Sequence, residues 1–269
     1  MSWRPIFAIV RRDLRLVARA RAVVMPLVIV PLIFFVVFPI GAVVGIRAGG
    51  DGLGELAPLI QMLPPHVVAA LGPPPLARQL TVYLLEYQFA SFFLLVPLMV
   101  CAVIAADSFA GEKERKTLEA LLYTPTSDRE LYLAKLLGPW LAAIGVSTLS
   151  YAVYLVIINA LAAGEVGRPV GITPLWMLTV LWLGPAVGAM AISILVVVSA
   201  RVRGFQEAYQ LGGVIVLPVV ALVVGQLAGV VVLDVGLAGI LGAVVWLVAA
   251  AILYFASRGF RRERLLRQV

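Results

Sequence analysis

Six apolar runs, each long enough to cross a lipid bilayer, constrain this chain more than any other feature. A transmembrane helix needs about 20 predominantly apolar residues. Such runs lie at 22–46, 87–106, 136–162, 173–199, 209–233 and 235–257. Because the bilayer core offers no water to backbone N–H and C=O groups, each run is expected to cross as a helix. The sequence predicts an all-α integral membrane protein with six transmembrane helices in one domain, residues 1–269.

The composition agrees with this class and excludes several kinds of site. Hydrophobic residues make up 62% of the chain and charged residues 13%, against about 25% charged in soluble domains. The one cysteine is Cys101, inside a span, and the one histidine is His66. A single cysteine cannot form an intramolecular disulfide or a thiolate cluster, and a single histidine cannot supply a di-histidine metal site. We therefore expect no metal site and no catalytic residue.

The basic residues predict the topology. Of the 21 Lys and Arg residues, 18 lie in the N-terminal segment, between spans two and three, after span four or after span six. The other three are Arg47, Arg78 and Arg168. Because cytoplasmic loops carry the excess of Lys and Arg, we expect both termini in the cytoplasm and a multi-pass location in the cell (plasma) membrane. The same charge could indicate nucleic-acid binding, but topology and attraction to anionic headgroups explain it.

Two segments outside the spans have distinct patterns. Over 1–21, Trp3, Ile6, Val10, Leu14 and Val17 recur at helical spacing, while Asp13 and most arginines lie on other faces. This pattern predicts an amphipathic helix in the membrane interface; the alternative is a simple extension of the first span. Segment 47–86 is interrupted by glycines and prolines. It is too small for a separate domain, and we expect it to cap the external mouth.

The segment between spans two and three, 108–125, is a second amphipathic helix by its pattern. Asp107 or Ser108 can cap its start, and a Thr-Pro pair ends it. Charged residues surround one apolar stripe, formed by Leu118, Leu121 and Leu122. Ser127 and Glu130 then form a capping box that predicts the start of the third helix. A solvated loop between helices is the plain alternative.

The amino-acid sequence of this segment resembles that of a known family. The run GEKERKTLEALLYTP over 111–125, followed by Arg129-Glu130 and Lys135, is similar to the signature of type-2 ABC transporter (ABC-2) permeases. The resemblance is closest to the sodium- and drug-exporter-like branch. One departure is Lys116, at a position where the family often has glycine.

The resemblance implies that 108–125 is a coupling helix bound by a separate cytoplasmic ABC ATPase, which binds ATP and Mg. It also implies a second permease subunit, identical or related, in the same bilayer. The residues that would contact the ATPase are Glu112, Glu114, Arg115, Thr117, Leu118, Glu119, Leu121, Leu122 and Pro125. None of the three lysines follows a glycine, so the chain has no Gly-Lys-Ser/Thr phosphate loop. We expect no enzyme activity and no cofactor in this chain itself.

Polar residues in the spans are candidates for a pathway or gate, because they are expensive in a bilayer. The candidates are Glu86, Asn159 and Gln226. Glu86, Asp107 and Asp234 lie near span ends, where a carboxylate is ordinarily solvated. Asn159 and Gln226 are expected to bond between helices, with substrate binding as the alternative.

Together these features predict the permease subunit of an ATP-driven exporter. A membrane anchor or signalling subunit could use the same helix to bind a partner. A gradient-driven secondary transporter is a further alternative, although no carboxylate or histidine relay lies at mid-depth.

Overall fold

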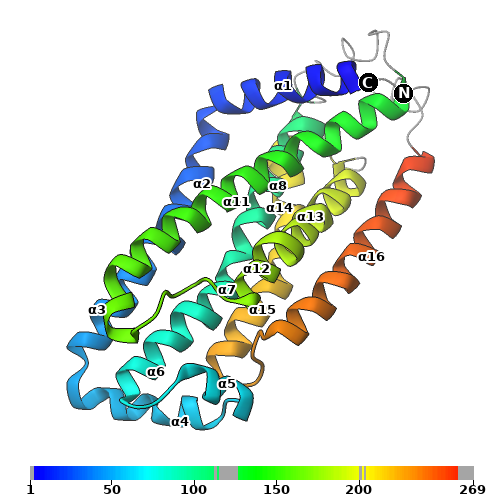
Figure 1. Ribbon diagram of the computed structural model, residues 1–269. Helices are drawn as coiled ribbons and strands as arrows, with labels where there is room; N and C mark the ends of the chain where they lie inside the picture. Colours follow the sequence, from blue (N-terminus) through cyan, green and yellow to red (C-terminus); the bar gives the residue numbers. More distant parts are fainter. Residues whose placement is uncertain (1–2, 112–113, 115–126, 200–201, 203, 260–269) are drawn as a thin grey trace.

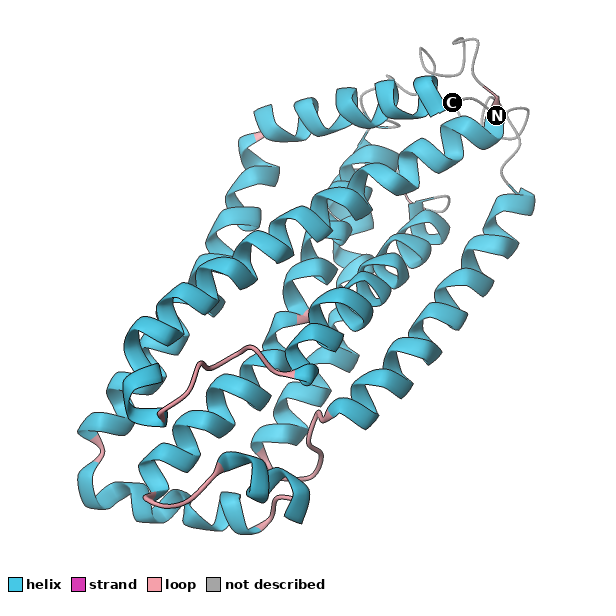
Figure 2. Cartoon of the chain, in the orientation of Figure 1, coloured by secondary structure: helices cyan, strands magenta, loops and turns pink. Residues whose placement is uncertain are grey.

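A computed structural model of the chain shows a bundle of long apolar helices (Figures 1 and 2). The structure describes all residues except 1–2, 112–113, 115–126, 200–201, 203 and 260–269. Within the described part, six helices are long and apolar enough to cross a membrane, which confirms the predicted number of candidate spans. In chain order they are Val24–Ala48, Leu76–Ala106, Glu130–Val166, Pro174–Ser199, Phe205–Leu227 and Val235–Ala256.

Most spans are built from several helical pieces, where η marks a π- or 3₁₀-helical stretch. Before and within the first span are α1 Trp3–Arg19, α2 Arg21–Leu32, η1 Ile33–Val37 and α3 Phe38–Ala48. Short helices η2 Gly50–Leu56, α4 Ala57–Gln61 and α5 Pro65–Leu71 follow. The second span comprises α6 Leu76–Val82, η3 Tyr83–Gln88, α7 Phe89–Phe93 and α8 Leu95–Ala106, and continues into η4 Asp107–Gly111. The remaining elements are α11 Asp128–Val166, α12 Pro174–Leu178, η5 Thr179–Leu183, α13 Gly184–Ser199, α14 Phe205–Gly212, η6 Gly213–Ile215, α15 Val216–Leu227 and α16 Val235–Gly259.

Prolines account for several of the interruptions. A proline has no N–H, so the carbonyl four residues before it loses its helical partner. The π-helical stretches η1 and η5 end two residues before Pro39 and Pro185, and the break between α7 and α8 lies three residues before Pro97. Neighbouring helices and local π turns satisfy the freed groups, which makes proline tolerable inside a membrane helix.

The two ends of the bundle differ in charge. Helix α1, the start of α11 and the end of α16 lie at one end, which we call the Arg-rich end (Figure 1). Helices α4 and α5 lie at the other, which we call the opposite end. Among the described residues, α1 brings five arginines to the Arg-rich end: Arg4, Arg11, Arg12, Arg15 and Arg19.

The second span lies at the centre of the bundle. It is almost wholly enclosed, whereas the first, fifth and sixth spans are mostly exposed apolar surface, as expected for helices that face lipid. A cluster of buried aromatic rings joins it to the first, third and fourth spans. The rings belong to Phe35, Phe93, Tyr151, Tyr154 and Trp176. The indole of Trp176 lies 5.0 Å from the Tyr154 ring and 5.1 Å from the Tyr151 ring, measured between centroids.

Several helix boundaries differ from those of the predicted spans, and two of the differences change the loops at the opposite end. The second helix begins at Leu76 instead of 87, directly after Pro75, because the residues that follow are apolar enough to continue the span. Part of the expected external segment 47–86 is therefore helix. The fifth helix ends at Leu227 instead of 233, since Gly229 has a positive φ of 71° and turns the chain.

Helix α1 is present over the residues that the pattern indicates, but its inner face contacts protein. The contacts are made by Ile6, Ile9 and Val10 with Leu131 and Ala134 of α11. Trp3 and Phe7 are exposed, and Asp13, expected on a polar face, is buried. The helix therefore has two apolar faces, one packed on the third span and one free to meet lipid.

The close approach of the second and fourth spans at Gly184 gives a stability prediction. A Cβ at Gly184 would lie 3.0 Å from the Thr179 carbonyl oxygen and 3.1 Å from a Phe93 ring carbon. We expect Gly184→Val to lower the free energy of unfolding by about 1–3 kcal/mol through overpacking. Gly145→Val on exposed α11 surface, where no atom lies within 4 Å, should change it by less than about 0.5 kcal/mol. Thermal unfolding in detergent measures both, and equal losses would contradict this view of the packing.

Candidate functional site

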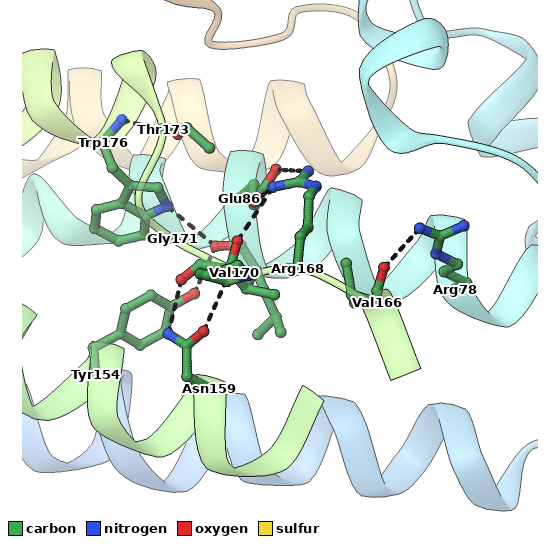
Figure 3. A network of polar contacts seen from close by, with 12 residues as sticks. Arg78, Glu86, Tyr154, Asn159, Val166, Arg168, Val170, Gly171, Thr173 and Trp176 are labelled. Carbon is green, nitrogen blue, oxygen red and sulfur yellow. Dashed lines mark hydrogen bonds and ion pairs between the residues drawn. The ribbon is translucent and has the colours of Figure 1, made fainter. Parts of the chain in front are cut away.

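An ion pair between a buried carboxylate and a part-exposed guanidinium lies near the opposite end of the bundle. The two carboxylate oxygens of Glu86 accept hydrogen bonds from Arg168, at 2.7 Å and 2.8 Å (Figure 3). Glu86 is only 3% exposed, so the expectation that it is solvated is wrong. It lies well inside the second helix, which begins earlier than expected. Hydrogen bonding to Glu86 raises the pKa of the Arg168 guanidinium, because the carboxylate favours the charged form.

The loop that carries Arg168 is held by the third span. The Asn159 side chain donates to the Val170 carbonyl at 2.9 Å and accepts from the Val170 N–H at 2.9 Å (Figure 3). The Tyr151 hydroxyl donates to the Gly171 carbonyl at 2.9 Å. Gly167 and Gly171 have positive φ values of 75° and 82°, which glycine adopts without strain. Asn159 thus bonds to a loop rather than to another span, and both ends of its amide are used.

The π-helical stretch of the second span offers a further bonding site. The Leu85 carbonyl accepts from the Tyr154 hydroxyl at 2.6 Å and from the Trp176 indole N–H at 3.3 Å. A π turn changes the backbone pairing and frees carbonyls in this way. The third and fourth spans are therefore both hydrogen-bonded to the second at one point, next to Glu86.

Gln226 joins the fifth span to the second, as the interhelical interpretation predicts. Its side-chain oxygen accepts from the Ser91 hydroxyl at 2.7 Å and from the Leu233 N–H at 3.1 Å. Its backbone carbonyl accepts from the Tyr83 hydroxyl at 2.9 Å. Gln226 is fully buried. One side chain thus fixes the end of α15, the middle of the second span and the turn before α16.

A cavity of about 250 Å³ lies beside the Glu86–Arg168 pair. A second pair lines it, His66 and Asp234, whose side chains are 3.0 Å apart. Asp234 also accepts from the Leu237 N–H at 2.8 Å and so caps α16. Asp234 is partly exposed, as expected near a span end. The two pairs connect α5, the second span, the 167–173 loop and α16 around one polar cavity.

At the Arg-rich end, Lys135 connects three elements. Its ammonium donates to the Ser108 carbonyl at 2.8 Å and lies 3.7 Å from the Asp13 carboxylate. Lys135 and Asp13 are both buried, and Asp107 is also buried rather than solvated. The Ser127–Glu130 capping box is present, with hydrogen bonds of 3.3 Å and 3.1 Å. The start of α11 is thus fixed to α1 and to the end of the second span.

Of the predicted ATPase-contacting residues, the structure describes Glu114. Its carboxylate accepts from the Phe205 N–H, the first residue of α14, at 2.9 Å. The remaining predicted contacts lie outside the described residues; they are Glu112, Arg115, Thr117, Leu118, Glu119, Leu121, Leu122 and Pro125.

Sequence reasoning missed the partners of the polar groups. From the sequence, Arg168 was identified only as one of the three basic residues outside the basic segments. A carboxylate in a span needs a partner, and an arginine on the same side of the membrane as Glu86 is a candidate for it. That signal was available. The Asp13–Lys135 pair could be found only from the packing of α1 on α11.

Comparison with known proteins adds the family. A family model described as "ABC-2 family transporter protein" matches residues 7–240. A search of curated proteins finds no match. The match covers most of the chain, including all of segment 108–125, and members of this family are permeases without ATPase domains. The chain belongs to the ABC-2 transporter family, as a membrane component.

Proposed function

We propose that this chain is the permease subunit of an ATP-driven exporter. A separate cytoplasmic ATPase, which binds ATP and Mg, docks on segment 108–125 and drives movement of the spans. The observation that carries this proposal is the family match over residues 7–240, because it includes that segment. The amphipathic pattern supports it, since leucines and charges at helical spacing suit a groove on a partner.

We further propose that the Arg-rich end faces the cytoplasm and that a second permease subunit completes the transporter. The excess of Lys and Arg supports the orientation. The large outward apolar surface of the first, fifth and sixth spans suits lipid and a second subunit. The sodium- and drug-exporter-like branch remains our assignment from the resemblance. An amphiphilic or lipid-like cargo would suit a permease whose spans carry few charges.

In this proposal the polar cavity at the opposite end is a closed outer gate. Glu86, Asn159 and Gln226 hold the loops and helix ends that would have to separate for release. ATP binding would favour a second state in which these contacts part, since a ligand shifts an equilibrium by its differential affinity for two states.

Two alternatives to an ATP-driven permease predict different behaviour. An anchor or signalling subunit would bind a partner without ATP-dependent movement. A secondary transporter would need a carboxylate free to titrate, whereas Glu86 is held by two hydrogen bonds from Arg168. Dependence of transport on the ATPase, and not on an ion gradient, separates the proposal from both.

The orientation predicts a labelling pattern. In a Cys101→Ala background, Gln61→Cys on exposed α4 should react with a membrane-impermeant maleimide in intact cells. Arg11→Cys on α1 should react only after the membrane is opened. The reverse pattern would show that the Arg-rich end faces outward.

Docking of the ATPase predicts a loss of binding when segment 108–125 is altered. The detergent-solubilised protein should co-purify with its ATPase, and Glu112→Ala/Glu119→Ala/Leu122→Ala should lose it by roughly tenfold or more, as for contacts central to an interface. The variant must remain folded by thermal unfolding. Glu55→Ala/Leu56→Ala at the opposite end is the matched control and should bind like wild type. Equal binding by the triple variant would favour the alternatives.

The proposed gate implies that Arg168→Ala and Arg47→Ala lower the free energy of unfolding by different amounts. Arg168→Ala leaves the Glu86 carboxylate, which is only 3% exposed, without its partner. Because the Arg168 side chain is itself 40% exposed, we expect the free energy of unfolding to fall by about 1–3 kcal/mol, the cost of a buried acceptor left unpaired. Arg47 forms an ion pair with Glu165 in which both side chains are nearly half exposed, so Arg47→Ala should lower it by less than about 1 kcal/mol. Denaturant titration of both variants checks the difference; similar losses would mean that Glu86 does not depend on Arg168.

A further inference from the structure

The side chain of Glu114 contacts the fifth span of its own chain. Glu114 belongs to segment 108–125, which the resemblance identifies as the docking site of the ATPase. Its carboxylate nevertheless accepts a hydrogen bond from the Phe205 N–H of the same chain, at 2.9 Å. The two residues are 91 positions apart. The contact therefore joins the segment between spans two and three to the first residue of span five.

The start of α14 needs such a partner. The first N–H groups of a helix have no acceptor within the helix, and the residue before α14 is Gly204, which offers no side-chain cap. A carboxylate at a helix N-terminus is favourable because of the helix dipole. Glu114 thus supplies from a distant segment the cap that the local sequence lacks.

Gly204 leaves the space for this carboxylate. A Cβ at Gly204 would lie 2.7 Å from the Glu114 carboxylate oxygen, closer than real Cβ contacts allow. Its φ of −155° is extended backbone open to any residue, so the backbone does not require glycine here. The Glu114 carboxylate is the far end of a flexible side chain, so a Cβ at this position would displace it from the Phe205 N–H rather than clash with fixed structure.

The far end of the same span is also held. Gln226, next to the last residue of α15, bonds to Ser91 of the second span and to the Leu233 N–H of the turn before α16. Between the two ends, η6 interrupts the span and much of its surface is exposed. The fifth span therefore runs from the Glu114 contact to the polar groups of the opposite end.

We propose that Glu114 is a positioning residue that links segment 108–125 to the fifth span. Movement of the segment is passed to α14 through this hydrogen bond and, along the span, to Gln226 at the opposite end. The inference rests on the proposed function for the source of movement. The contact itself can be tested without the ATPase.

A double-mutant cycle tests the contact. Glu114→Ala removes the carboxylate, and Gly204→Ala displaces it, so each should lower the apparent melting temperature by roughly 2–4 °C. Because both changes break one interaction, Glu114→Ala/Gly204→Ala should lose no more than the larger single loss. Losses that add in the double variant would overturn the contact.

A second variant separates linkage from helix capping. Glu114→Ala/Gly204→Ser gives α14 a cap from its own N-cap residue, so the melting temperature should return to that of wild type. Linkage is followed by maleimide labelling of Leu233→Cys, a buried position beside Gln226, in a Cys101→Ala background with the ATPase bound. In an otherwise wild-type chain, ATP and Mg should raise the labelling rate by roughly fivefold or more.

Glu114→Ala/Gly204→Ser should keep the melting temperature of wild type but lose this ATP-dependent rise. Labelling is measured with the ATPase at saturating concentration, so that a lower affinity caused by removing the Glu114 carboxylate does not mimic the loss. A full rise in that variant would show that Glu114 serves only to cap α14, and would overturn the proposal. If the ATPase does not bind the wild-type chain at all, the proposed function fails, while the double-mutant cycle still reports on the contact by itself.

Discussion

A polar group inside a bilayer has no water to bond, so its partner must come from the protein. In this chain most of those partners belong to the second span. Glu86 binds Arg168, the Leu85 carbonyl accepts from Tyr154 and Trp176, and Ser91 donates to Gln226. The enclosure of this span makes the arrangement possible, because only a helix surrounded by others can offer polar groups to several neighbours. The position of the loops at the opposite end depends on these bonds.

The sequence predicts those features that depend on composition along the chain. The six apolar runs, the clustering of basic residues and the Ser127–Glu130 capping box all follow from local patterns. Which spans are enclosed by the others cannot be predicted in this way, since lipid-facing and buried faces of a membrane helix are equally apolar. The start of the second helix at Leu76 was missed because Arg78 and Glu86 interrupt the apolar run and were assigned to the external segment. Arg78, which lies in its first turns, donates to the Val166 carbonyl, a partner that only the fold reveals.

The candidate polar residues were found from the sequence, but their roles needed the structure. Asn159 uses both ends of its amide in bonds to protein groups, and Gln226 uses its side-chain oxygen twice, which favours a role in holding the opposite end together. Within the described residues the buried amide nitrogen of Gln226 has no hydrogen-bond partner. Glu86 was expected in water because its helix was expected to begin beside it. Ten further residues of helix precede it, and burial then makes Arg168 necessary.

The two ends of the molecule differ in how they could move. At the Arg-rich end, Lys135 is buried against the Ser108 carbonyl and Asp13, so α1, the third span and the end of the second are joined by groups that water cannot replace. The contact of Glu114 with Phe205 is exposed, and a single exposed hydrogen bond contributes little stability. At the Arg-rich end the fifth span is therefore held less firmly than the third, whereas nearer the opposite end buried hydrogen bonds join it to Tyr83, Gln88 and Ser91 of the second span. In the proposed mechanism, a movement that begins in segment 108–125 would pass along α14 and α15 to Gln226, where the second span, α15 and the turn before α16 share one side chain.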